Sequence, residues 1–264
     1  MRASARIPGG YAGTTLLLLS LMVAGLLGGC AGLQSQTSLD QRRAAEVNAE
    51  LGISYLRQNE LAQAQRALER ALQFDPRLAM AHLGMASLRE RQGSTDSAVK
   101  HYRQALALEP DNPYVQTNLG DLLCRQEQFQ EGQALLAKAI ANTSYSAREV
   151  AFLSAGICDL RMGNVAGAEE RMRESLRVDP QYHEALYELA LLTYADGRAF
   201  QTRAFLSRLS ALGVVTPQSL LLCYRSEMQL GNRGDAQSCA DRLRRDFADS
   251  REAAELVRLE RTHG

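Results

Sequence analysis

The sequence predicts an all-α protein built from about six copies of one helix pair. Three observations lead to this prediction. A pattern of small and large apolar residues returns every 34 residues through the first three copies. The central part of the chain is rich in Ala, Leu, Gln, Glu and Arg, which favour helices. Glycine and proline stand where a helix pair would turn or end.

The repeated unit is clearest in its first copy, which begins at Ala45. Leu51 and Gly52 stand seventh and eighth, Ala64 stands twentieth, and Pro76 ends the second helix. These positions resemble the tetratricopeptide repeat (TPR), in which small residues stand where two helices cross. The resemblance implies a right-handed superhelix. In this sequence the frame of the repeat slips by two residues after the third copy. The predicted repeats occupy residues 45–78, 79–112, 113–146, 149–182, 183–216 and 217–250.

Several local signals refine this prediction. Asn112-Pro113 and Thr216-Pro217 each place a capping residue before a proline that can start a helix. Repeat five is the weakest, because Thr202 occupies the usual alanine position. Residues 251–264 predict a terminal helix that covers the core of repeat six with Ala253, Leu256 and Leu259.

The first 29 residues predict a lipoprotein signal peptide. Two arginines precede an apolar run, Leu16–Leu27, which Gly28 and Gly29 follow. The ending Leu27–Cys30 resembles a bacterial lipobox, which implies that Cys30 is acylated, becomes the first residue and anchors the protein by lipid. By the same resemblance, Ala31 indicates the outer membrane. The alternative is a plain secretory signal. Residues 30–44 predict the lipidated cysteine followed by a flexible tether.

The chain shows no sign of catalysis or of nucleic-acid binding. Its 30 basic and 30 acidic residues create no overall field for a polyanion. The four histidines have no metal-ligand spacing, and there is no phosphate-binding glycine loop, HExxH helix or nucleophile elbow. We therefore expect no enzyme activity, no cofactor and no metal.

A binding surface is predicted on the first helices of the repeats. In a TPR array, positions 2, 5, 9, 12 and 13 face a concave groove, and here many of them are apolar. Such a surface suits an amphipathic helix or an apolar peptide. The alternative is that neighbouring repeats already cover many of these side chains. The predicted groove comprises Ile53, Leu56, Arg57, Met80, Leu83, Arg91, Tyr114, Arg125, Val150, Leu153, Ile157, Leu160, Tyr187, Leu191 and Tyr194.

Arginine recurs at position 13 of the first four repeats, as Arg57, Arg91, Arg125 and Arg161. This ladder suits a carboxylate clamp for an acidic partner. However, position 13 also lies in the last turn of each first helix, where a cation complements the helix dipole. We favour this structural interpretation.

Four cysteines follow Cys30, namely Cys124, Cys158, Cys223 and Cys239. Cys223 and Cys239 fall on the two helices of one repeat and can approach each other, so a disulfide is possible outside the cytoplasm. We favour buried free thiols over this alternative.

The combination of lipobox, tether, six repeats, the insertion after repeat three and the run Thr216–Leu222 resembles the PilF/PilW family of type IV pilus biogenesis lipoproteins. The resemblance implies a pilotin, anchored in the outer membrane by an acyl chain such as palmitate on Cys30 and facing the periplasm. Such a protein binds secretin subunits and promotes their assembly; we expect it to be a monomer. The alternatives are a general TPR adaptor that recruits peptidoglycan enzymes or envelope assembly factors, and a regulator of a hydrolase.

Overall fold

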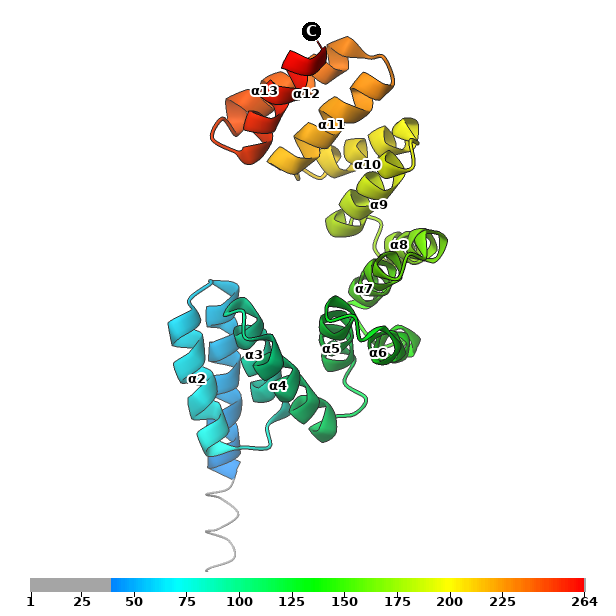
Figure 1. Ribbon diagram of the computed structural model, residues 1–264. Coiled ribbons are helices and arrows are strands. Elements are labelled where there is room, and N and C mark those ends of the chain that lie inside the picture. Colours follow the sequence, from blue (N-terminus) through cyan, green and yellow to red (C-terminus); the bar gives the residue numbers. More distant parts are fainter. Residues whose placement is uncertain (1–38, 264) are drawn as a thin grey trace, which may run out of the picture. The chain divides into compact units, whose positions relative to one another are not determined.

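The computed structural model describes residues 39–263, and within that part of the chain it contains helices joined by short turns and no strand. This confirms the predicted all-α fold. The chain divides into two compact units between Leu108 and Glu109 (Figure 1). The predicted signal peptide and Cys30 lie outside the described residues.

The described part of the first unit, residues 39–108, holds two helix pairs. They are an N-terminal helix over residues 39–57 with α2 (Leu61–Phe74), and α3 (Ala79–Arg91) with α4 (Thr95–Leu108).

The N-terminal helix begins earlier than the sequence pattern indicates. Residues 39–44 belong to this helix and not to a tether. They lack an apolar period, but Asp-Gln-Arg-Arg-Ala contains strong helix formers, and Arg42 pairs with Glu46 one turn later. Local propensity therefore extends the helix without any buried face.

Leu68 is the centre of packing in this unit. It is fully buried, and it packs in one cluster with Met85 and Leu88, which are also buried. A Cβ built on either Gly52 or Gly84 would lie 2.6 Å from its side chain. One large residue of α2 thus fills the space left by two glycines on neighbouring first helices. This is the small-to-large complementarity that close helix crossing requires.

The second unit holds four helix pairs and a last single helix. The helices are α5 (Pro113–Arg125), α6 (Phe129–Ala141), α7 (Arg148–Arg161), α8 (Val165–Val178), α9 (His183–Ala195), α10 (Ala199–Ala211), α11 (Pro217–Gln229), α12 (Arg233–Asp246) and α13 (Arg251–His263).

Two helix starts in this unit use the capping residues named above. The side chain of Asn112 accepts hydrogen bonds from the backbone N–H groups of Tyr114 and Val115. Thr216 forms a capping box with Ser219 at the start of α11. In both cases proline is the first helical residue, where its missing N–H costs nothing.

The last helix closes the apolar core of repeat six, as predicted. Ala253 and Leu256 of α13 are buried in one cluster with Leu220 and Leu243, and Leu259 packs against the edge of that cluster. Because α13 contacts both α11 and α12, it covers the surface on which a further repeat would otherwise stack.

Candidate functional site

The structure assigns part of the predicted groove to the core of the protein. Leu56 is only 5% exposed and packs with Leu68 and Met85, while Leu153 is 6% exposed and belongs to the main core of the second unit. These two residues are therefore core side chains and are not available as an exposed surface. Sequence pattern assigned them to the groove because it resolves helix faces only to within a position or two.

In the first unit, three apolar groove residues are half-buried: Ile53, Met80 and Leu83. Met80 packs against a small cluster formed by Ala49, Ala71 and Ala81. These side chains therefore present part of their surface and use the rest to join the first helices to one another.

Two members of the arginine ladder have structural partners. Arg91 donates a hydrogen bond from Nη1 to the carbonyl oxygen of Leu56, near the end of the N-terminal helix. The Nε of Arg125 lies 3.0 Å from Oδ2 of Asp121 on its own helix. A cation at a helix C-terminus meets unsatisfied carbonyl groups, so Arg91 stabilises the neighbouring first helix. Arg57 and Arg161 are exposed.

In the second unit, Tyr114 at the start of α5 pairs with Tyr145, which lies in the loop between α6 and α7. Tyr114 is 46% exposed, and its ring meets that of Tyr145 edge to face, with 4.8 Å between ring centroids. Its hydroxyl shares a 2.8 Å hydrogen bond with Ser146. Tyr145 is buried, which raises the pKa of its phenol. The insertion after repeat three thus serves to fix the orientation of an exposed tyrosine, while Val150 beyond it is half-buried.

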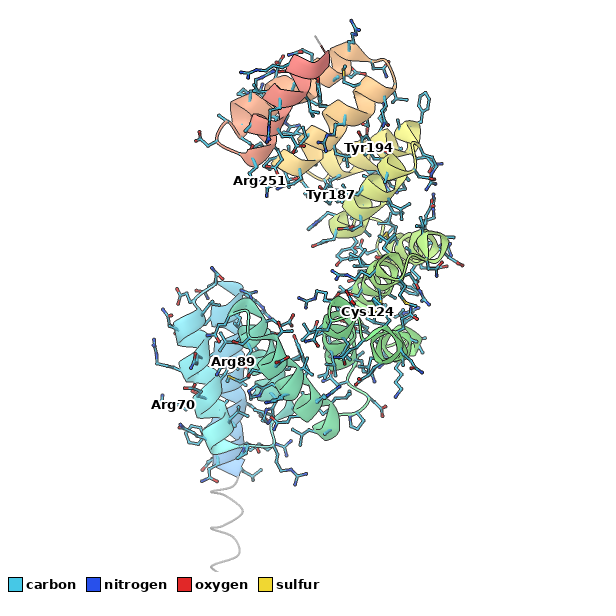
Figure 2. All side chains as sticks on the ribbon, viewed as in Figure 1. Arg70, Arg89, Cys124, Tyr187, Tyr194 and Arg251 are labelled. Atoms are coloured by element: carbon cyan, nitrogen blue, oxygen red, sulfur yellow. A yellow bond between two sulfur atoms is a disulfide. The ribbon has the colours of Figure 1, made fainter. Side chains whose placement is uncertain are left out.

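The strongest candidate for a binding surface lies on α9. Tyr187, Leu191 and Tyr194 are spaced by four and three residues, which places them on one face of the helix; we call this the α9 face. The two tyrosines pack partly on the core, and Leu191 is 36% exposed. Figure 2 shows both tyrosines on α9 and Arg251 at the start of α13. Ile157 and Leu160 of α7 also pack on this core while remaining half-buried.

Acidic groups accompany the α9 face. Burial raises the pKa of Tyr187, and the nearby carboxylates of Glu188 and Glu252 raise it further. Burial also raises the pKa of Glu188 itself. The surface therefore combines apolar and aromatic side chains with partly desolvated negative charge. Such a surface can bind an amphipathic segment that carries basic residues beside its apolar face.

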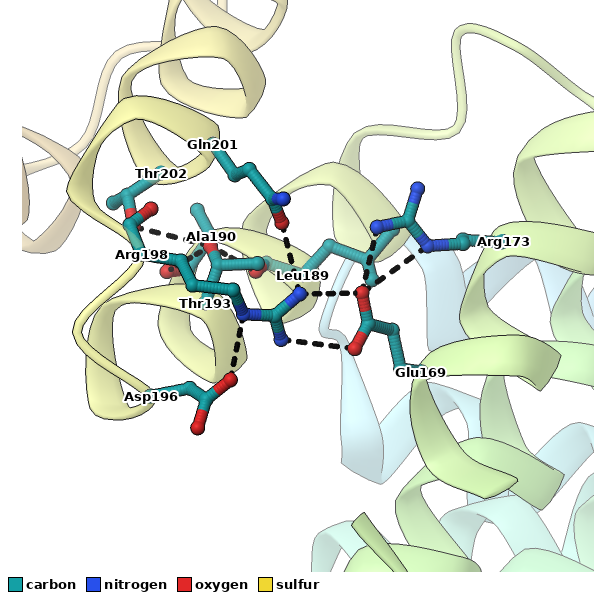
Figure 3. A network of polar contacts seen from close by, with 9 residues as sticks. All are labelled: Glu169, Arg173, Leu189, Ala190, Thr193, Asp196, Arg198, Gln201 and Thr202. Atoms are coloured by element: carbon teal, nitrogen blue, oxygen red, sulfur yellow. Dashed lines mark hydrogen bonds and ion pairs between the residues drawn. The ribbon is translucent and has the colours of Figure 1, made fainter. Parts of the chain in front are cut away.

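Repeat five, which carries the α9 face, is well packed despite its atypical sequence. Thr202 is fully buried, and its hydroxyl oxygen lies 3.1 Å from that of Thr193, which donates to the carbonyl of Leu189 (Figure 3). A hydroxyl pair thus replaces the usual alanine contact between α9 and α10. Because each buried hydroxyl has a partner, the substitution leaves no unsatisfied polar group.

An ion-pair network joins repeat five to repeat four. Arg198, in the turn before α10, binds both carboxylate oxygens of Glu169 on α8, at 2.9 and 2.8 Å. Arg173 binds the same carboxylate (Figure 3). These hydrogen bonds lower the pKa of Glu169 to about 2. The network holds the helix pair that carries the α9 face against its neighbour.

The four cysteines form two disulfides, so the preferred prediction of free thiols is wrong. Cys223 on α11 pairs with Cys239 on α12, which is the pairing named as the alternative. Cys124 on α5 pairs with Cys158 on α7, and sequence reasoning missed this pair. The available signal was their separation of 34 residues, which is close to the distance between the starts of repeats three and four at residues 113 and 149. Consecutive first helices lie side by side, and this brings the two Cα atoms within 5.4 Å.

The described residues contain neither a metal site nor a membrane-spanning helix. No group of three or more His, Cys, Asp or Glu side chains between residues 39 and 263 could hold a metal ion. Over the same part of the chain, none of the helices has both the length and the apolar character needed to cross a membrane.

The chain is similar to known TPR proteins. Two profiles of the tetratricopeptide repeat match it, one over residues 50–113 and 153–199 and the other over residues 90–144. The type IV pilus assembly protein PilF of Pseudomonas aeruginosa is 30% identical over 243 residues, which cover 90% of this chain and 96% of PilF. An uncharacterized protein of Haemophilus influenzae is 31% identical over 125 residues, which cover 47% of this chain and 70% of that protein.

Two solved structures agree with this relationship. A structure of Pseudomonas aeruginosa PilF has a TM-score of 0.72 and 29% identity, and the match covers 83% of this chain and 98% of that one. The crystal structure of PilW, described as a widely conserved type IV pilus biogenesis factor, has a TM-score of 0.74 and 28% identity. The match covers 81% of this chain and 98% of the PilW chain. The chain therefore belongs to the PilF/PilW family of TPR proteins of type IV pilus biogenesis.

Proposed function

We propose that this protein is an outer-membrane lipoprotein that acts as a pilotin: it binds secretin subunits and promotes their assembly in the outer membrane. Membership of the PilF/PilW family carries the proposal. TPR proteins are scaffolds for protein interactions, and the α9 face offers a surface for one. Tyr187, Leu191 and Tyr194 keep apolar surface accessible that a partner could bury.

The composition of the α9 face favours a protein segment over a glycan or a nucleic acid. Aromatic and aliphatic side chains contribute most binding free energy when they bury an apolar ligand surface. The carboxylates of Glu188 and Glu252 would repel a polyanion. A short helix of the secretin with apolar residues on one side and Lys or Arg at its border would match both features. The small and large residues at the TPR signature positions would hold the surface in place without contacting the ligand.

The proposed location follows from two independent arguments. The lipobox-like ending at Cys30 supports anchoring by lipid to the outer membrane. The two disulfides support export, because structural disulfides persist in oxidising compartments and are rare in the cytosol. An anchored protein of this kind would face the periplasm, where secretin subunits pass before they enter the outer membrane.

A matched pair of variants tests the role of the α9 face. Leu191 and Leu212 are both 36% exposed, but Leu191 lies on the α9 face and Leu212 follows the end of α10. We expect Leu191→Glu to weaken binding of a purified secretin subunit at least about tenfold, since it places a charge in an apolar contact, and Leu212→Glu to leave it unchanged. Binding would be measured by titration calorimetry with the soluble Cys30→Ser protein.

Pull-down from solubilised membranes with the same proteins identifies the partner. Recovery of secretin with wild type and Leu212→Glu, but not with Leu191→Glu, supports the proposal. Recovery of a peptidoglycan hydrolase without secretin would instead support the adaptor function and contradict piloting.

A further inference from the structure

The Cys223–Cys239 disulfide lies in a cleft, unlike the other disulfide. A cleft of about 520 Å³ opens between α10, α11 and α12, and both cysteines line it. Both are half-buried. By contrast, Cys124 and Cys158 are only 2% and 0% exposed and pack against Leu136 and Ala155. The two disulfides of one folded protein therefore differ in access to solutes.

The cleft is large enough for a small thiol and carries suitable charge. Apolar residues such as Leu206, Val214 and Leu220 form its wall, and Arg203, Arg242 and Glu227 also line it. Arg203 is bound to Glu227 by an ion pair, and Nε of Arg242 lies 3.5 Å from Asp246. Both guanidinium groups remain partly exposed, so they favour the approach of an anionic thiolate.

We propose that Cys223–Cys239 is a thiol–disulfide exchange site in the folded protein, open to small monothiols. A thiolate attacks one sulfur, forming a mixed disulfide and expelling the other cysteine as a thiolate. A second thiolate then attacks the sulfur of the bound thiol and releases the second cysteine thiolate. Two thiols are oxidised to one external disulfide, the protein disulfide is reduced, and both cysteines take up protons. This inference does not depend on the proposed secretin binding.

Exchange at this site would affect the packing contact between repeats five and six. Cys223 packs against the core that contains Leu186 and Leu209, whereas Cys239 packs against the core that α13 closes. The disulfide therefore ties together side chains of two separate core clusters. Reduction would remove this cross-link, while the backbone of α11, which supplies Leu222 to the first cluster and Leu221 to the second, would still join them.

Native-state reduction tests the proposal. The purified protein with both disulfides is incubated with excess reduced glutathione, and free thiols are trapped with iodoacetamide and located by peptide mass spectrometry. We expect Cys223 and Cys239 to be alkylated at least about tenfold faster than Cys124 and Cys158, whose exchange requires local unfolding. Equal rates, or faster alkylation of Cys124 and Cys158, would overturn the proposal.

Two tryptophan variants test whether the cleft is the route. Ala211 and Ala141 are both exposed last residues of a second helix, but only Ala211 lines the cleft. Ala211→Trp should slow alkylation of Cys223 and Cys239 at least about threefold by filling the cleft, and Ala141→Trp should not. Circular dichroism verifies that each variant is folded. If a folded Ala211→Trp protein exchanges as fast as wild type, the cleft is not the route and the proposal fails.

Discussion

Gly120 and Gly132 lie against each other where α5 crosses α6. A Cβ on Gly120 would lie 2.9 Å from the carbonyl oxygen of Gly132, and a Cβ on Gly132 would lie 2.8 Å from that of Gly120. Backbone thus meets backbone at the eighth and twentieth positions of repeat three. These carbonyl oxygens belong to the backbone of the two helices, so they cannot move aside as the end of a flexible side chain could.

This contact predicts that Gly120→Ala destabilises the protein. The new methyl group would also lie 2.8 Å from Cγ of Leu136. We expect a loss of about 1 to 3 kcal/mol in the free energy of unfolding, from overpacking. Gly234→Ala is the control, because nothing lies within 4 Å of its Cβ in α12, and it should stabilise the protein by about 0.5 to 1 kcal/mol. Urea denaturation followed by circular dichroism measures both; an unchanged stability of Gly120→Ala would contradict the tight crossing.

The helix pairs and their small crossing residues could be predicted from the sequence because each depends on a local pattern that repeats. Gly52 opposite Leu68 is an example, since small and large residues alternate at fixed positions. The early start of the N-terminal helix could not be read from apolar periodicity, because residues 39–44 form no buried face. The sequence signal for this early start was the high helix propensity of those residues.

The site was less predictable because it depends on contacts between repeats. Leu56 and Leu191 occupy positions of the same predicted face, but the first is enclosed by Leu68, Met85 and Leu88, whereas the second keeps 36% of its surface exposed. The Cys124–Cys158 bond likewise joins consecutive repeats, so no pattern within one repeat indicates it.

A histidine pair, in which His82 is buried and His101 is half-buried, predicts a pH dependence in the first unit. Nε2 of His82 donates to the carbonyl of Pro76, so its Nδ1 accepts from Nδ1–H of His101 at 3.2 Å. Burial, together with His82 and Arg89, lowers the pKa of His101 below 6.5. The unfolded chain therefore binds this proton more readily, and stability falls as pH decreases below about 6.5 toward the lowered pKa.

We expect wild type to lose more stability than His101→Gln between about pH 7.5 and 5.5. Chemical denaturation at the two pH values measures the difference, and groups that titrate in both proteins cancel. An identical pH dependence of wild type and variant would contradict the assignment.

The Glu169 network predicts a second, more acidic transition. Since Arg198 and Arg173 lower the pKa of Glu169 from 4.5 to about 2, its contribution is present above pH 4.5 and is lost as pH falls toward 2. Glu169→Gln should lower the free energy of unfolding by about 1 kcal/mol at neutral pH. This difference from wild type should vanish as the pH approaches about 2. Glu170→Gln, at an exposed neighbouring position, is the control. A constant difference across this range would rule out the ion pair as its cause.

The two disulfides should differ in their contribution to stability. Cys124–Cys158 spans 34 residues and Cys223–Cys239 spans 16, so chain entropy predicts losses of about 4 and 3 kcal/mol when each pair is replaced by alanine. Thermal unfolding of the two double variants shows which disulfide contributes more to stability, and the variant without Cys124–Cys158 should unfold at the lower temperature. A protein that lacks Cys124–Cys158 and unfolds like wild type would show that this bond does not constrain the fold.

We propose that a lipid on Cys30 carries this TPR protein and the secretin subunits that it binds to the outer membrane. The most direct measurement is the amount of secretin multimer in outer-membrane fractions of cells that express wild type or Cys30→Ser. The variant should be folded and soluble in the periplasm, and secretin multimers should fail to reach the outer membrane. Normal outer-membrane secretin in cells with Cys30→Ser would contradict lipid-driven piloting.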